Sequence, residues 1–155
     1  FARGTWGAAA LGLSLWHAGV TAPAALIEAY RLPLPQLEAG AMISVFSPAM
    51  MDVSDGLLID AARMADASQV GIRIDLDALP LSADFVAIAG SDRAARLRAA
   101  TGGDDYQLLF VSGRPLPILP CPVTRIGQIV RGSGVHLHDS GGDVTLPDRL
   151  GWEHQ

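Results

Sequence analysis

Residues 50–58 read MMDVSDGLL, and this stretch decides how the chain folds. Its apolar start is typical of a buried strand, which the two Asp residues and the Ser then interrupt. Ser54 and Asp55 are both common N-cap types, so we expect a helix to begin directly after them. Apolar residues then recur at intervals of three and four, as on one face of a helix: Leu57, Leu58, Ala61, Met64 and Ala65.

Asp52 and Asp55 lie three residues apart at the predicted end of the strand. Two carboxylates about 4 Å apart repel by roughly 4 kcal/mol at an effective dielectric near 20. A helix dipole returns only about 0.3–1 kcal/mol. Either one Asp points to water, or a cation lies between them; with oxygen donors alone, Mg²⁺ is favoured over Zn²⁺. Helix amides beside such a metal would seat a phosphate. The alternative is a capped helix start with two solvated carboxylates.

The composition indicates one globular domain. The chain has 155 residues, of which 50% are hydrophobic and 17% charged, which argues against disorder. We expect a single α/β (α+β) domain over residues 1–155, with a mixed sheet of about four to six strands and helices packed on it.

Several function classes are excluded or disfavoured. The net charge of −5 disfavours a nucleic-acid surface, and no run approaches the roughly 18 apolar residues that span a membrane. The chain has no Lys, which excludes a Walker-type phosphate loop and a catalytic Lys. Phosphate would therefore be bound by metal, backbone amides or Arg. Cys121 is the single cysteine, which fits a reducing compartment and predicts a cytoplasmic protein.

The remaining pattern alternates between helices and strands. Helices are predicted over residues 6–16, 24–31, 83–89 and 92–100, the last with an Arg-rich solvated face. Strands are predicted over 72–76 and 106–111, and residues 123–130, 135–137 and 144–146 are expected to form a meander. Residues 101–105 read TGGDD, a second acidic turn in which Gly103 allows a ligand to approach the backbone. An ordinary helix-to-strand loop is the alternative for this turn.

Six motifs in this order resemble the second half of the thiamine-monophosphate kinases, within the aminoimidazole-ribonucleotide-synthetase-like superfamily. The resemblance covers nearly the whole chain, and its specificity comes from the order of the motifs. They are GTWG at 4–7, MDVSDGL at 51–57, IDLDALPLS at 74–82, GGDDY at 102–106, TRIG at 124–127 and GWEH at 151–154.

The resemblance implies transfer of the γ-phosphoryl group of ATP to thiamine monophosphate, which gives thiamine diphosphate, with several Mg²⁺ ions and no side chain acting as acid or base. By the same resemblance, Asp52 and Asp55 would be Mg²⁺ ligands and Ser54 would contact ATP. Asp104 and Trp152 would contact the thiamine substrate. For Trp152 the alternative is a C-terminal anchor on the core.

Two departures from the family pattern matter. Ala8 stands where family members commonly have Asp, so any role of that Asp is absent. The family's amino-terminal half, which supplies further metal ligands, ATP contacts and a homodimer interface, is missing. We therefore expect a C-terminal domain that is inactive alone. The alternatives are another ATP-dependent enzyme of the superfamily, in purine synthesis, selenophosphate formation or hydrogenase maturation, and a non-catalytic α/β ligand-binding module.

Overall fold

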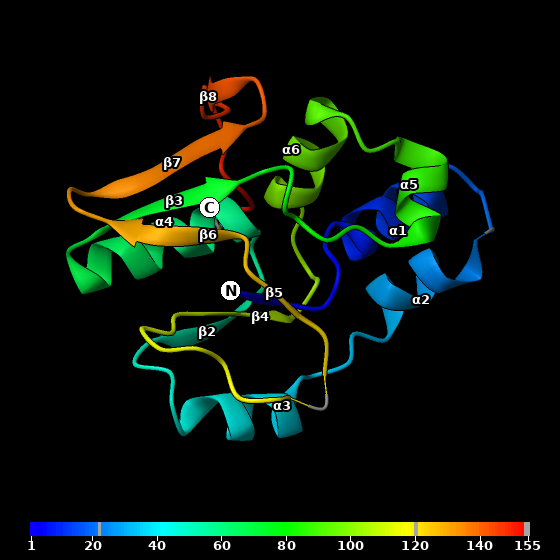
Figure 1. Cartoon of the computed structure of the whole chain (residues 1–155). Coiled ribbons are helices and arrows are strands. Elements are labelled where there is room, and N and C mark those ends of the chain that lie inside the picture. Colours follow the sequence, from blue (N-terminus) through cyan, green and yellow to red (C-terminus); the bar gives the residue numbers. More distant parts are fainter. Residues whose placement is uncertain (22, 120, 154–155) are drawn as a thin grey trace.

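The computed structural model describes residues 1–21, 23–119 and 121–153, and within these ranges it contains six helices and eight strands in two four-stranded sheets. Figure 1 shows the sheets one above the other, with α3 beneath the first and α4 behind the second. The helices are α1 (Ala8–His17), α2 (Ala24–Arg31), α3 (Leu37–Ser44), α4 (Leu57–Ser68), α5 (Ala83–Ala89) and α6 (Arg93–Thr101). The strands are β1 (Ala2–Arg3), β2 (Met50–Val53), β3 (Gly71–Asp75), β4 (Gln107–Phe110), β5 (Val123–Thr124), β6 (Gly127–Val130), β7 (Gly134–Asp139) and β8 (Gly142–Val144).

The first sheet has the order β2-β4-β1-β5 with antiparallel neighbours throughout. Strand β2 pairs with β4 so that Asp52 lies opposite Leu108 and Val53 opposite Gln107. The two acidic motifs predicted from the sequence therefore lie next to each other, because one spans the end of β2 and the other directly precedes β4. This pairing positions the candidate site.

The second sheet has the order β6-β3-β7-β8 and is mixed, since β3 runs parallel to β7 and antiparallel to β6. The α/β (α+β) class with a mixed sheet is thus confirmed, although the strands are divided between two sheets. The predicted meander is wrong in part. Only the β7–β8 hairpin joins consecutive strands, because β3 inserts between β6 and β7.

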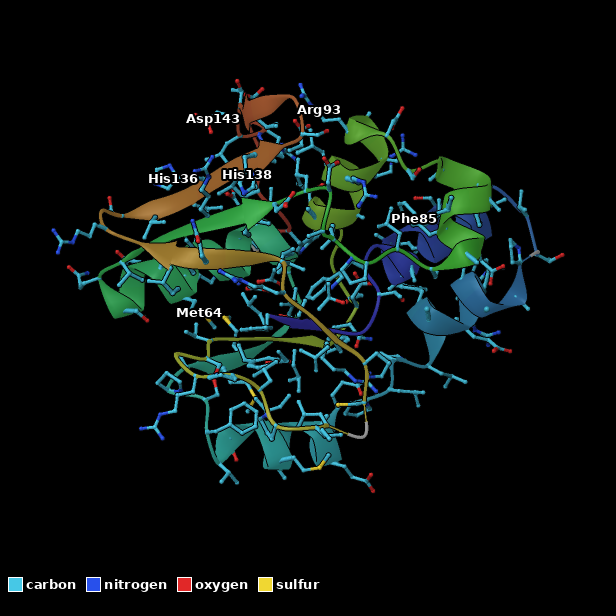
Figure 2. All side chains as sticks on the ribbon, in the orientation of Figure 1. Met64, Phe85, Arg93, His136, His138 and Asp143 are labelled. Carbon is cyan, nitrogen blue, oxygen red and sulfur yellow. The ribbon has the colours of Figure 1, made fainter. Side chains whose placement is uncertain are left out.

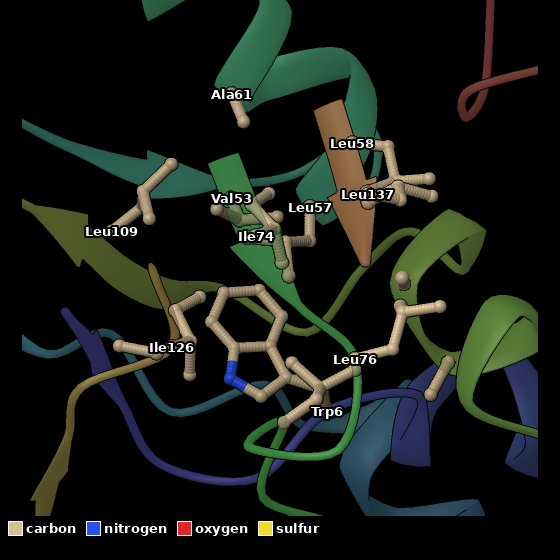
Figure 3. Close-up of a cluster of buried hydrophobic side chains, with 14 of the residues drawn as sticks. Trp6, Val53, Leu57, Leu58, Ala61, Ile74, Leu76, Leu109, Ile126 and Leu137 are labelled. Atoms are coloured by element: carbon tan, nitrogen blue, oxygen red, sulfur yellow. The ribbon is translucent and has the colours of Figure 1, made fainter. Parts of the chain in front are cut away.

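The main core lies between the two sheets and is closed by α4. Strands β2 and β3 contribute Val53 and Ile74, α4 contributes Leu57, and all three are at most 1% exposed. Figure 3 shows the Trp6 indole ring at the centre of this cluster, beside Ile126. A second, smaller cluster joins α3 to the outer face of the first sheet through Ala39, Ile43, Leu108 and Phe110.

The helix starts partly confirm the predicted caps. Ser82 accepts from the amide of Phe85, and Asp92 accepts from that of Ala95, as expected for N-caps. For α4 the prediction was wrong: Gly56 is the N-cap residue, and no side chain caps that helix. Ser54 and Asp55 precede it in the turn, where they have other contacts.

Two stretches differ from the expected pattern. The helix predicted over 6–16 begins only at Ala8, and α3 forms over residues 37–44, where the sequence predicted no helix. α3 packs Ala39 and Ile43 against the first sheet while Leu37 and Val45 stay exposed. Tertiary packing on the sheet therefore decides this helix.

The arginines of α6 serve the structure. Arg93 lies beside the β7–β8 hairpin (Figure 2). Its Nε and Nη2 atoms donate to Asp139 at 2.6 and 2.9 Å. Arg96 donates to the carbonyls of Leu76 and Leu79, both at 2.9 Å. Arg93 and Arg98 are exposed and Arg96 is partly exposed, so the prediction of a largely solvated face is confirmed, and the contacts of Arg93 and Arg96 add a structural role to it. No helix of the described residues is long and apolar enough to cross a membrane.

Helices α1 and α2 pack closely at Gly12, where an added Cβ atom would lie 1.9 Å from the Leu26 carbonyl oxygen. We predict that Gly12→Ala lowers the free energy of unfolding by about 2 kcal/mol despite the better helix propensity of Ala, because backbone atoms must move apart. Urea denaturation measures this. Gly113→Ala, whose Cβ would meet nothing within 4 Å, should change stability by less than about 0.5 kcal/mol. Equal effects of the two substitutions would contradict close packing at Gly12.

Candidate functional site

Three segments far apart in the sequence meet at the turn between β2 and α4. The carbonyls of Val53, Ser54 and Asp55 accept, in that order, from the amides of Tyr106, Asp104 and Trp152, at 2.9, 2.7 and 2.8 Å. The turn therefore binds the loop before β4 on one side and the C-terminal segment on the other. Every residue that the sequence placed in the site lies on one of these three segments.

The close approach of these segments depends on two glycines. A Cβ atom at Gly103 would lie 2.8 Å from the Ser54 carbonyl oxygen, and one at Gly151 would lie 2.5 Å from that of Asp55. Any side chain at either position would force the segments apart. Gly103 was expected to let a ligand approach the backbone; in the structure the close neighbour is the β2–α4 turn.

Asp60, in the first turn of α4, shapes the β2–α4 turn from below. It is 1% exposed, and its Oδ2 atom accepts from the amides of both Ser54 and Asp55 at 3.1 Å. Burial of a carboxylate is costly unless it is hydrogen-bonded and paired, and these amides meet part of that need. Asp60 therefore fixes the backbone of the turn before α4, whereas Ser54 and Asp55 were predicted to cap the helix.

Arg63 supplies the positive charge. Its Nη1 atom donates to Asp55 Oδ2 and to Asp60 Oδ1, both at 2.6 Å. These two carboxylates raise the pKa of the Arg63 guanidinium further above its usual value. Asp52, by contrast, is exposed at the end of β2. The repulsion expected between Asp52 and Asp55 is thus relieved by a guanidinium and by water, so electrostatics alone does not require a metal here.

The residues of this turn nevertheless fit Mg²⁺ in chemical type. Asp52, Ser54 and Asp55 offer only oxygen donors, which suit a hard cation. Across the residues that the structure describes, no three His, Cys, Asp or Glu side chains come together as a metal cluster. Mg²⁺ is commonly held by one or two carboxylates, with phosphate oxygens and water completing the sphere. The turn could therefore supply part of a coordination shell and no more.

Asp105, next to the predicted substrate residue, is a structural carboxylate that sequence reasoning missed. It is 7% exposed, and its two oxygens accept from the amides of Gly7 at 2.6 Å and Ala9 at 3.1 Å at the start of α1. Burial raises the pKa of Asp105 to about 7, against the lowering effect of the amides of Gly7, Ala9 and Ala8. The carboxyl group thus ties the loop before β4 to α1.

The backbone on both sides of Asp105 is in the left-handed region, with φ of 66° at Asp104 and 48° at Tyr106. Asp tolerates this conformation better than Tyr, for which it is a strained state that costs of order 1–3 kcal/mol. The hydrogen bonds of both amides to the β2–α4 turn and the buried Asp105 hold the loop in place. Such strain is concentrated at functional sites in proteins.

Asp104 lines a cavity of about 380 Å³. The other walls of the cavity come from α1, α2, the connector between α2 and α3, and the loop before β4. The remaining lining residues are Trp16, Tyr30, Arg31, Pro33 and Tyr106. Trp16 and Tyr30 meet edge to face, and the Arg31 guanidinium lies 4.8 Å from the Trp16 ring centroid. The cavity combines aromatic faces with one acidic and one basic side chain. Trp152 does not line it and is 65% exposed beside the turn.

Comparison with known proteins agrees with this geometry. The model of the family "AIR synthase related protein, C-terminal domain" matches residues 31–109, just over half of the 155 residues. The chain belongs to this family. The match includes the β2–α4 turn and the loop before β4, and thus four of the five site residues predicted from the sequence.

Relatives that this chain matches are named thiamine-monophosphate kinase. The one from Caulobacter vibrioides is 36% identical over 97% of this chain and 46% of its own length. The structure of the enzyme from Stenotrophomonas maltophilia K279a has a TM-score of 0.77 and 34% identity over 92% of this chain and 50% of its own. A structure of AaThiL complexed with AMPPCP and TMP has a TM-score of 0.82 and 33% identity over 99% of this chain and 50% of its own. The chain spans about half the length of the relatives that it matches.

The raised pKa of Asp105 makes the stability of the fold depend on pH. Because its pKa is about 7 in the folded state and about 3.9 in an unfolded chain, the unfolded chain loses this proton first as pH rises. The stability that the protonated carboxyl contributes is complete below about pH 4 and is lost between about pH 4 and 7. We predict that the stability of the parent protein relative to Asp105→Asn falls over this range. Urea denaturation at several pH values measures it, and a relative stability that stays constant between about pH 4 and 7 would show that Asp105 is already ionised in the folded state.

Proposed function

We propose that this protein takes part in transferring the γ-phosphoryl group of ATP to the phosphate of thiamine monophosphate, which gives thiamine diphosphate. The observation that carries the proposal is the meeting of the three predicted site segments at consecutive carbonyls of the β2–α4 turn. Relatives named thiamine-monophosphate kinase, and a related structure with AMPPCP and TMP, support it.

The acceptor side of the site is the cavity beside Asp104. Thiamine monophosphate carries a cationic thiazolium ring and an anionic phosphate. Aromatic faces attract cationic rings, and the cavity offers Trp16 and Tyr30 together with the carboxylate of Asp104 and the guanidinium of Arg31. These groups match a flat ligand with one charge of each sign. Trp152, exposed next to the turn, offers a further aromatic face to the substrate.

The nucleotide side of the site is the β2–α4 turn. Asp52 and Asp55 would hold Mg²⁺, and the hydroxyl or amide of Ser54 would contact ATP. Mg²⁺ bound there would neutralise charge on the phosphates that must approach each other. The acceptor is already an anionic phosphate, so the chain needs no general base, and its residues act by binding and orienting the two substrates.

The remaining elements of the proposal concern the whole protein. We infer that residues 1–155 form one domain and that a second domain, corresponding to the unmatched half of the relatives, completes the metal and nucleotide sites and forms a homodimer. The relatives' greater length supports this division. The single Cys121 fits a reducing compartment and so supports a cytoplasmic protein.

The cavity assignment predicts residue-specific losses of affinity. Isothermal titration of the chain with thiamine monophosphate should show binding that Asp104→Asn weakens about fivefold, because an opposing charge is lost. Trp16→Ala should weaken it by a similar factor through the lost cation–π contact. Asp66→Asn, an equal change of charge on the exposed face of α4, should leave binding unchanged. If the first two variants bind like the parent, the acceptor lies elsewhere.

The division into two domains predicts that the 155-residue chain has no activity alone. In a steady-state assay with ATP, Mg²⁺ and thiamine monophosphate, the chain should form no thiamine diphosphate above the background of a protein-free sample. The physical reason is that two carboxylates at one turn leave most of the charge of two phosphate substrates unbalanced. Turnover that disappears in Asp52→Asn would instead show that this domain is sufficient.

A further inference from the structure

Arg63 holds two carboxylates with one nitrogen atom. Nη1 lies 2.6 Å from Asp55 Oδ2 and 2.6 Å from Asp60 Oδ1. The surroundings of the two acids differ: the side chain of Asp60 is 2% exposed, whereas that of Asp55 is 12% exposed. Asp60 also binds two amides of the turn. Asp60 is therefore the partner that most needs a permanent counter-charge, and Asp55 is at the outer end of the network.

Because Asp60 is more deeply buried than Asp55, the ion pairs of Arg63 can be arranged in two ways. Arg63 can bridge both acids, as in the structure, or it can stay on Asp60 alone and release Asp55. Its side chain is 48% exposed, so water can solvate the nitrogen atoms of the guanidinium in either arrangement. The second arrangement keeps the buried charge of Asp60 paired, which avoids the high cost of an uncompensated buried ion. In that arrangement Asp60 would still accept from the amides of Ser54 and Asp55, which fix the backbone of the turn.

We propose that Arg63 competes with a divalent cation for the carboxylate of Asp55 and so sets the metal affinity of the β2–α4 turn. The proposal rests on the proposed function, which places Mg²⁺ at Asp52 and Asp55. Arg63 acts here as a positioning residue, since it touches the metal ligand and no substrate. While Arg63 holds Asp55, the turn is shielded from unwanted cations; a metal that arrives with nucleotide phosphates replaces the guanidinium at Asp55.

The test is a titration of the chain with Mn²⁺, followed by the electron paramagnetic resonance signal of the free ion. Arg63→Gln should bind Mn²⁺ about tenfold tighter than the parent protein, because a positive charge close to the ligand is removed. The double variant Arg63→Gln with Asp55→Asn should lose this gain. Arg93→Gln is the matched control, since Arg93 is also half exposed (52%) and also pairs with an Asp, and it should bind like the parent.

A second variant covers the case in which Arg63→Gln fails to fold because Asp60 loses its partner. Arg63→Lys keeps a positive charge for Asp60, but the Lys side chain is one atom shorter, so its ammonium group reaches both acids at once less easily. It should bind Mn²⁺ at least about twofold tighter than the parent.

Two negative results are distinguishable. If the parent binds Mn²⁺ through Asp55 and neither Arg63 variant binds it more tightly, the role of Arg63 is overturned and the proposed metal site survives. If no variant shows binding that Asp55→Asn removes, the metal role of Asp55 is overturned, and the role of Arg63 with it.

Discussion

Three consecutive peptide carbonyls accept hydrogen bonds from distant parts of the chain: those of Val53 and Ser54 from the loop before β4, and that of Asp55 from the C-terminal segment. Every residue has a backbone carbonyl whatever its side chain is. These hydrogen bonds therefore hold the three segments together without using the side chains of the candidate site residues. The close approach of the segments also explains the two glycines. A Cβ atom at Gly103 or Gly151 would collide with a carbonyl of the turn. Together with the pairing of β2 and β4, which positions Asp52, these bonds bring the candidate site residues together.

The charges at the turn are arranged in layers. Asp60 is buried and shapes the backbone, Arg63 balances it, Asp55 lies at the margin, and Asp52 faces water. Each step outward lowers the cost of exchanging one partner for another, because water screens exposed charges more strongly than buried ones. A site built in this way can hold its geometry in the absence of metal, whereas two facing carboxylates would repel each other. The repulsion that the sequence predicted between Asp52 and Asp55 is thus reduced by a positive charge of the chain itself, that of Arg63.

Local signals predicted most elements, and long-range contacts account for what the sequence missed. Ser82 and Asp92 cap their helices because the cap lies within the same segment. The insertion of β3 between β6 and β7 was missed because pairing partners far apart leave no local pattern. In the site, the residue types alone indicated the two acidic turns. The roles of Arg63 and Asp105 were missed, because they depend on contacts that no sequence pattern indicated. A carboxylate on the apolar side of a helix, as at Asp60, was the available signal that a partner must be close.

The link between β5 and β6 has a further consequence. Thr124 ends a strand of the first sheet and Gly127 begins one of the second, so only two residues connect the sheets at this point. One of them, Ile126, is 2% exposed and belongs to the shared core. Such a short tether cannot lengthen while one sheet opens and the other stays closed. The amide protons of both sheets should therefore exchange with solvent through the same cooperative unfolding event.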